Sequence, residues 1–124
     1  LARQTSVSPA DLAPLPMVLL DLPFSTDYFL SVFTRAGLRP RIVERTRDMG
    51  VMRAMVANGF GYSIANIRPV TDQAPDGGRL AHVPLAGPVR PLQLGLAVMA
   101  GAGLALTVQA FVDHARATLT PGTA

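Results

Sequence analysis

Several residue types are missing from this chain of 124 residues, and each absence excludes a class of chemistry. There is no cysteine, which excludes disulfides, thiol catalysis and thiolate metal ligands. The only two histidines, His82 and His114, are far apart in the sequence, and neither has an acid or a nucleophile at a catalytic spacing. We therefore expect no metal, no cofactor and no enzymatic activity.

Long apolar runs are also missing. The longest candidate, residues 92–106, is interrupted by Gln93 and by glycines, so a membrane span is not expected. No basic segment precedes a short apolar run, so the sequence shows no secretory signal. The expected compartment is the cytoplasm, and no membrane partner is expected.

Lysine is missing as well, so all eleven basic residues are arginines, set against eight acids for a net charge of +3. Arginine binds phosphate in a two-pronged geometry. A net charge this small is nevertheless a weak indication of nucleic-acid binding by this segment itself. The densest basic stretch, residues 35–47, is expected to be a solvated face that pairs in part with Glu44 and Asp48.

The length and the apolar content of 49% suit one ordinary globular core. Residues 17–21 form a short apolar run that predicts a buried parallel strand. Ser25, Thr26 and Asp27 then offer N-cap chemistry for a helix, and Gly37 suits its left-handed C-terminal cap. Apolar residues recur in this helix at helical spacing: Tyr28, Phe29, Val32, Phe33 and Ala36.

A second unit of the same kind follows. Residues 41–46 are predicted to form a strand, and Asp48 is predicted to cap a helix that ends at Asn58 and Gly59. Residues 61–65 are predicted to form a third strand. Two consecutive strand–helix–strand connections imply parallel strands, so we predict an α/β fold with an open, mostly parallel sheet flanked by helices.

The last third of the chain is predicted to be less regular. Residues 67–79 contain prolines and glycines typical of an exposed loop, and strands are predicted at 80–85 and 92–99. An amphipathic helix is predicted from Leu104, and residues 121–124 should be a frayed tail. The apolar stripe of that helix comprises Val108, Phe111, Val112, Ala115 and Leu119.

Polar residues follow the predicted strands at the edge where open parallel sheets usually bind ligands. Ser25 and Thr26 offer hydroxyls beside helix-terminal amides, which suits a carboxylate, although they are equally suited to be simple N-caps. Asn66 can both donate and accept a hydrogen bond, or it is a turn residue before Pro69. The glycines around Phe60 indicate backbone geometry rather than a phosphate loop.

The order of these segments resembles the regulatory domain of LysR-type transcriptional regulators, whose fold is like that of type 2 periplasmic binding proteins. Residues 1–16 (LARQTSVSPADLAPLP) look like the family's entry into its second subdomain. Residues 48–66 (DMGVMRAMVANGFGYSIAN) are similar to the family's helix, V-A-x-G-x-G turn and following strand, and are the most specific part. Many members have a Leu-Pro pair where this chain has Asn66 and Ile67.

The resemblance implies a division of the chain. Residues 1–91 would be the second subdomain of the effector-binding region, and residues 92–124 the return strand and C-terminal helix of the first. The rest of the first subdomain and the winged helix-turn-helix that reads DNA would lie outside the chain. By the same resemblance, the effector-binding residues would be Ser25, Thr26, Thr46 and Asn66.

The implied function is effector sensing rather than catalysis. A small, anionic metabolite would bind between the two subdomains and change a DNA-bound homo-oligomer, a dimer or a tetramer, in a transcription regulator. The exposed stripe of the last helix independently favours oligomerisation. The alternative is a lobe of a solute-binding protein of the same fold that serves a transporter.

Overall fold

The computed structural model describes residues 1–90, 95–99 and 103–119. It divides the chain into two compact units, Leu1–Arg90 and Pro91–Ala124, and each is described here by itself. The assignment of these parts to the second and first subdomains of an effector-binding region stays a prediction.

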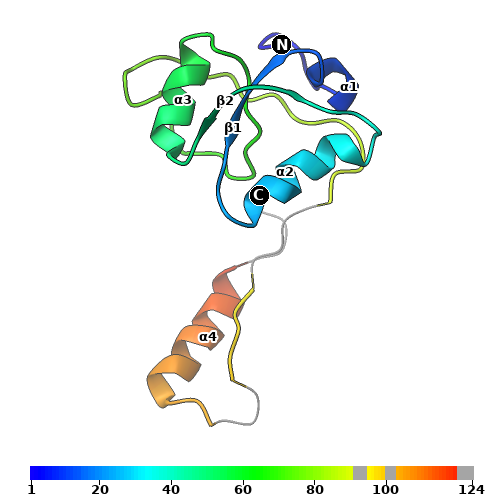
Figure 1. Cartoon of the computed structure of the whole chain (residues 1–124). Helices are drawn as coiled ribbons and strands as arrows, with labels where there is room; N and C mark the ends of the chain where they lie inside the picture. The colour runs from blue at the N-terminus through cyan, green and yellow to red at the C-terminus, as the bar shows by residue number, and fades with distance from the viewer. Residues whose placement is uncertain (91–94, 100–102, 120–124) are drawn as a thin grey trace. The chain divides into compact units, whose positions relative to one another are not determined.

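The first unit contains the predicted alternation of strands and helices (Figure 1). A short helix, α1 (Pro9–Leu12), leads into β1 (Pro16–Leu20), which is followed by α2 (Ser25–Thr34), β2 (Arg41–Thr46) and α3 (Met49–Ala57). The two strands are parallel neighbours, as predicted, and their paired ends are Pro16 with Arg41 and Leu20 with Thr46. The predicted α/β fold with parallel strands is confirmed.

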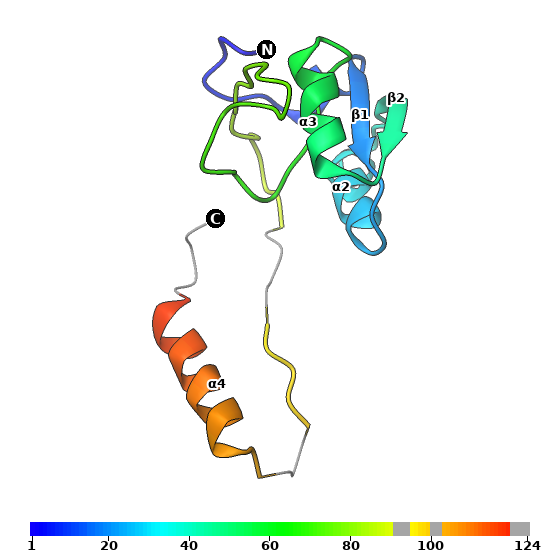
Figure 2. The ribbon, with the colours of Figure 1, turned by 90° about the vertical axis from the view of Figure 1, so that its left-hand side faces the viewer.

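Strand β1 is buried on both faces because α2 and α3 flank it (Figure 2). Successive side chains of a strand point to opposite faces. Met17 and Leu19 accordingly pack in one cluster with residues of α2, among them Phe33, whereas Val18 and Leu20 pack in a second cluster with Met52 of α3: the two clusters share no buried residue. A strand covered on both faces needs apolar residues throughout, which accounts for the unbroken run MVLL.

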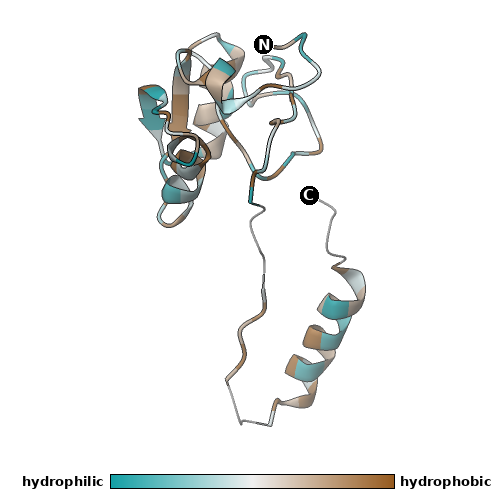
Figure 3. Ribbon diagram, turned by 90° about the vertical axis from the view of Figure 1, so that its right-hand side faces the viewer, coloured by the Kyte–Doolittle hydropathy of each residue, from teal (hydrophilic) through white to brown (hydrophobic). Residues whose placement is uncertain are grey.

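Strand β2 differs because it lies at the edge of this pair and is mostly exposed. Only Ile42 and Thr46 are half-buried, and the other four residues are exposed. Its sequence, RIVERT, contains the charged residues that such a position tolerates. Figure 3 shows the contrast as hydrophilic colouring on the outer strand beside the hydrophobic inner one.

The predicted third strand, residues 61–65, is wrong apart from one residue. Tyr62 forms a single parallel bridge with Met17, and its N–H donates to the Pro16 carbonyl at 3.0 Å. A Cβ at Gly61 would lie 2.2 Å from that carbonyl oxygen, so glycine is required by the close approach of the two backbones. Residues 63–65 form no bridge with any described residue.

The predicted strands in the last third are also wrong within the described residues. In residues 80–85 only Leu85 forms a bridge, a parallel one with Val7. Residues 95–99 have no strand structure, and residues 92–94 of that prediction lie outside the described residues. β-branched and apolar residues favour strands only where a neighbouring strand is available to pair with them.

The loop at 67–79 is confirmed as irregular. The sequence did not predict the side chain that holds this loop against α3. Arg53 of α3 is 9% exposed, and its Nη2 donates to the carbonyl oxygens of Thr71 and Gln73, both at 2.8 Å. Nearby, the Asn58 amide donates to Asp76 Oδ2 at 2.6 Å. Arginine is rarely buried, and here backbone carbonyls satisfy the side chain that holds the loop against α3.

The second unit contains α4 (Leu106–Thr118), which confirms the predicted amphipathic helix (Figure 3). Val112 and Ala115 are buried, whereas Phe111 is 61% exposed. The predicted stripe is therefore only partly covered. The predicted tail, residues 121–124, lies outside the described residues. Within the part of the chain that the structure describes, no helix is long and apolar enough to cross a membrane.

Candidate functional site

The ends of β1 and β2 are tied together at the carboxyl edge of the strand pair. Asp21 directly follows β1, and its N–H donates to the carbonyl of Thr46, the last residue of β2, at 2.8 Å. The residues that follow each strand are therefore held side by side. In open parallel sheets this edge is where ligands usually bind.

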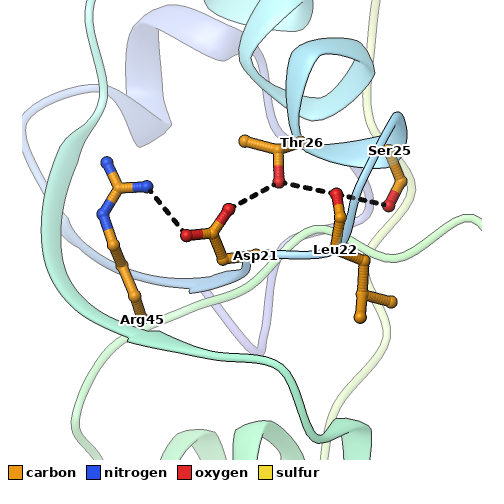
Figure 4. A network of polar contacts seen from close by, with 5 residues as sticks. All are labelled: Asp21, Leu22, Ser25, Thr26 and Arg45. Atoms are coloured by element: carbon orange, nitrogen blue, oxygen red, sulfur yellow. Dashed lines mark hydrogen bonds and ion pairs between the residues drawn. The ribbon is translucent and has the colours of Figure 1, made fainter.

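The start of α2 differs from the prediction that Ser25, Thr26 and Asp27 provide N-cap chemistry. The residue before the helix is Phe24, which has a left-handed backbone (φ 67°) and gives no side-chain cap. Ser25 and Thr26 lie inside the first turn, so their hydroxyls reach back and donate to the Leu22 carbonyl oxygen, at 3.4 and 3.0 Å (Figure 4). The predicted capping role is wrong, because a cap must precede the first turn.

The first amides of α2 remain available as donors. The N–H of Thr26 donates to the Leu22 carbonyl, but among the described residues no hydrogen bond is made by the N–H of Ser25 or Asp27. The first N–H groups of a helix have no intrahelical acceptor and carry its partial positive charge. With the hydroxyls engaged, these amides are the groups that can bind an anion here.

A carboxylate lies beside this helix start. The single proton of the Thr26 hydroxyl is shared between the Leu22 carbonyl and Asp21 Oδ1, which is 2.9 Å away. Asp21 Oδ2 is 3.4 Å from Arg45 Nη1 (Figure 4). Both charged side chains are substantially exposed, at 36% and 52%. An exposed pair of this kind contributes little stability, typically about 0 to 1 kcal/mol. It does place a cation beside the Asp21 carboxylate at this edge of the strand pair.

The basic stretch pairs differently from the prediction. Arg45 pairs with Asp21, and within the described residues Glu44 and Asp48 form no ion pair. The Asp48 carboxylate instead accepts a hydrogen bond from the Val51 N–H at 3.0 Å, which confirms the predicted cap of α3. Among the described residues, the bond that the Asp48 side chain makes is therefore to a backbone amide of α3 rather than to an arginine of the basic stretch.

Thr46 and Asn66 differ in how they are held. Thr46 is half-buried and its Oγ1 accepts a hydrogen bond from the Asp48 N–H at 3.1 Å. Asn66 is exposed, follows no strand, and within the described residues its side chain forms no hydrogen bond. The structure thus links Ser25, Thr26 and Thr46 through Asp21 and Leu22, and does not link Asn66 to them by hydrogen bonds. The ligand-binding role of all four stays a prediction.

A second polar cluster was missed in the sequence. His82 Nδ1 lies 3.1 Å from Asp72 Oδ1, and Arg68 is 3.8 Å from the same oxygen. Asp72 lies in the loop at 67–79, and nothing in its ten-residue separation from His82 indicates the contact. The described residues contain no group of three or more potential metal ligands.

Two hydroxyls near β1 are buried without hydrogen bonds to the described residues, those of Tyr62 and Ser63. Burial raises the pKa of the Tyr62 phenol to about 12. The phenol therefore stays protonated at neutral pH, and it is not available as a base. Neither hydroxyl is in contact with a described histidine that would make it a nucleophile.

The comparison with protein families decides which family this chain represents. The family model of the LysR substrate binding domain matches residues 1–120. The chain belongs to this family. Among the curated proteins compared, none matches the chain.

Solved structures of LysR-family regulators agree with this assignment. The chain is 38% identical to the PA01 protein, a putative LysR family regulator from Pseudomonas aeruginosa, over 96% of this chain and 42% of that one, with a TM-score of 0.90. It is 38% identical to HinK from the same organism, with 95% and 41% covered and a TM-score of 0.89. The C-terminal domain of a probable LysR family regulator from Rhodococcus sp. RHA1 is 32% identical, with 93% and 57% covered and a TM-score of 0.80.

These matches distinguish between the two functions that the sequence left open. All three similar structures are described as LysR family transcriptional regulators, so the chain is a partial LysR-type effector-binding domain rather than a lobe of a solute-binding protein. The chain spans about two fifths of the length of the first two structures. The type 2 periplasmic-binding-protein-like fold expected from the resemblance is confirmed with the family.

Proposed function

We propose that this chain senses a small anionic metabolite at the carboxyl edge of β1 and β2 and thereby modulates a regulator oligomer on DNA. The observation that carries the proposal is the start of α2, where the Ser25 and Asp27 N–H groups are unpaired among the described residues, in a chain of the LysR substrate binding domain family. Helix N-termini of this kind bind carboxylates and phosphates through backbone amides.

The side chains around these amides have complementary roles. The Thr26 and Ser25 hydroxyls both contact the Leu22 carbonyl, which supports the turn that carries the amides. Arg45 pairs with Asp21, which reduces the repulsion that an anion would meet from that carboxylate. The Asp27 carboxylate in the first turn of α2 forms no ion pair among the described residues, so an anion must bind the amides despite its charge. The hydroxyl of Thr46 and the exposed amide of Asn66 complete the proposed set of effector-binding groups. Thr46 is the last residue of β2, and Asn66 lies in the irregular segment after α3.

The DNA-binding step belongs to another part of the regulator. In this proposal a separate N-terminal domain binds DNA, and the assembly is a homodimer or homotetramer. The metabolite acts by binding one arrangement of the oligomer more tightly than the other, because only a difference in affinity can shift the equilibrium between them.

A thermal-shift screen of the intact protein tests the proposal. Small carboxylic acids are compared with their primary amides, which have the same size and no charge. A ligand that binds only the native state raises the melting temperature by mass action. The expected result is at least one acid that stabilises the protein while its amide does not.

The acid found in this way is then tested for regulation. Fluorescence anisotropy of a labelled operator is measured with and without the acid, and the expected result is a change in DNA affinity. An acid that stabilises the protein but leaves both DNA affinity and oligomeric state unchanged would contradict the regulatory part of the proposal. If only neutral compounds stabilise the protein, the anionic character of the effector is wrong.

A further inference from the structure

A groove in the first unit is lined by none of the residues of the candidate site. It is formed by one side of α2 and by the segment 86–90, and it has a volume of about 420 Å³. Tyr28, Ser31, Val32 and Arg35 provide the helical wall, at the spacing of residues that share one helix face. Arg35 is ten residues beyond Ser25, about 15 Å along the helix axis at 1.5 Å per residue. The groove shares no lining residue with the effector site proposed at the start of α2, but its nearest helical residue, Tyr28, is only three residues beyond Ser25.

The charge of the groove has one sign. Arg35 and Arg90 line it from its two walls, and no acidic residue lines it. In the part of the chain that the structure describes, neither arginine is in an ion pair. Arg35 lies at the C-terminal end of α2, where a cation is favourable for the helix dipole, so its position has a structural explanation. Arg90 follows an irregular segment and has no such explanation.

Most of the other residues that line the groove are apolar. Val32 is buried at the helical wall, and Pro88 and Val89 provide the opposite wall. Ser31 lies at the same wall, but its hydroxyl donates to the Tyr28 carbonyl at 2.6 Å, so its proton is not available to a ligand. The remaining donors in the lining side chains are the two guanidinium groups and the Tyr28 hydroxyl. A volume of this size is within the range of small-molecule sites, about 300 to 1,000 Å³.

We propose that this groove binds a small organic anion with an apolar body. The anionic group lies between Arg35 and Arg90, and the apolar body packs on Val32 and Val89. Guanidinium groups suit a carboxylate because their N–H groups match its two oxygens. A site with two cations and no acid selects against neutral and cationic molecules of the same shape.

Saturation-transfer NMR on the intact protein tests this inference, with hexanoate as the probe. Hexanoate has a carboxylate on a short alkyl chain, and 1-hexanol is the matched neutral probe. The expected result is saturation transfer to hexanoate, with a signal several times weaker for 1-hexanol under the same conditions. Equal signals for the two probes would overturn the proposal, because the arginines would then contribute nothing to selection.

Charge-matched variants locate the bound hexanoate. Arg35→Gln with Arg90→Gln is expected to weaken binding by about tenfold, because two charge-assisted contacts are removed. Arg3→Gln with Arg79→Gln removes the same charge from exposed arginines that do not line the groove, and is expected to leave binding unchanged. Because all four arginines are exposed, both double variants are expected to keep the wild-type melting temperature.

A third variant separates this groove from the proposed effector site. Ser25→Ala with Thr26→Ala is expected to keep the hexanoate signal. If that variant loses the signal while Arg35→Gln with Arg90→Gln keeps it, hexanoate binds at the start of α2 and the groove proposal is wrong. If the arginine variant instead changes the oligomeric state in sedimentation, the groove is an interface between copies of this chain, which also overturns the proposal.

Discussion

Strands β1 and β2 are hydrogen-bonded neighbours in parallel register, yet their surroundings are opposite. β1 has four buried residues in succession because helices cover both of its faces, whereas β2 has four exposed residues out of six. The difference shows that the position of a strand in its layers, rather than strand pairing itself, determines which residues it tolerates. The candidate site lies where both strands end, so one side of it adjoins the buried strand and the other adjoins the exposed one.

The largest expected effect is on the side of β1 that does not pair with β2. There the backbone of Gly61 lies against that of Pro16. Gly61→Ala would place a Cβ 2.2 Å from a backbone oxygen, and backbone atoms cannot move aside without disturbing β1. The expected loss is about 3 kcal/mol or more of the free energy of unfolding.

Gly87→Ala is the control for this change. Gly87 also has a positive φ (102°), but a Cβ there would meet no atom within 4 Å. Its expected cost is backbone strain alone, about 1 to 2 kcal/mol. Equal losses for the two variants in chemical denaturation would show that the contact with Pro16 contributes nothing.

The difference between the strands is tested by the same substitution in each. Val18 in β1 is fully buried, and Val43 in β2 is 39% exposed. Val18→Ala is expected to cost about 2 to 3 kcal/mol, from the lost apolar transfer and the cavity left behind. Val43→Ala is expected to cost less than about 1 kcal/mol, mainly through strand propensity. A similar loss in urea denaturation for both would contradict the assignment of β2 as the exposed edge.

A smaller effect is expected at the connection from β2 to α3. Asp48→Ala removes the side chain that accepts the Val51 N–H, and a lost N-cap typically costs about 1 kcal/mol. Asp27→Ala is the matched control in α2, whose first turn has no side-chain cap. Differential scanning calorimetry should show a lower melting temperature for Asp48→Ala than for the control, and the reverse order would contradict the cap.

The smallest expected effect concerns the turn that leads into β1. The Ser8 hydroxyl and N–H donate to Asp11 and lower the pKa of its carboxyl from its ordinary value. A carboxyl whose folded pKa is lowered stabilises the fold fully above its unfolded pKa, and this contribution is lost as the pH falls through the folded value. Asp11→Asn should therefore reduce the dependence of stability on pH below about pH 4. An unchanged acid limb in urea denaturation at each pH would contradict this coupling.

The sequence predicted the parts of the fold that local signals determine. The run MVLL, the Asp48 cap and Gly37 as a left-handed residue (φ 70°) are all confirmed, because burial, capping and positive φ each favour particular residue types. The predicted strands at 61–65 and 80–85 are wrong because pairing depends on a partner that is distant in the sequence. No local pattern shows that a partner is missing.

The candidate site was only partly predictable for the same reason. Ser25 and Thr26 are at the helix start as predicted, but the position of the first turn was off by one residue, and this reverses the direction of their hydrogen bonds. The contacts of Arg45 with Asp21 and of Arg53 with Thr71 join residues that are 24 and 18 positions apart. Charge alone does not choose among eight acids and eleven arginines.

The most direct test of the effector site is isothermal titration of the intact protein with the acid found in the thermal-shift screen. Ser25→Ala with Thr26→Ala removes the hydroxyls that hold the turn at Leu22, so affinity is expected to fall by about tenfold, which corresponds to about 1.4 kcal/mol. Ser31→Ala with Thr34→Ala makes the same chemical change at the other end of α2 and should leave affinity unchanged. Equal affinity for both variants and the wild type would place the effector elsewhere and contradict the account.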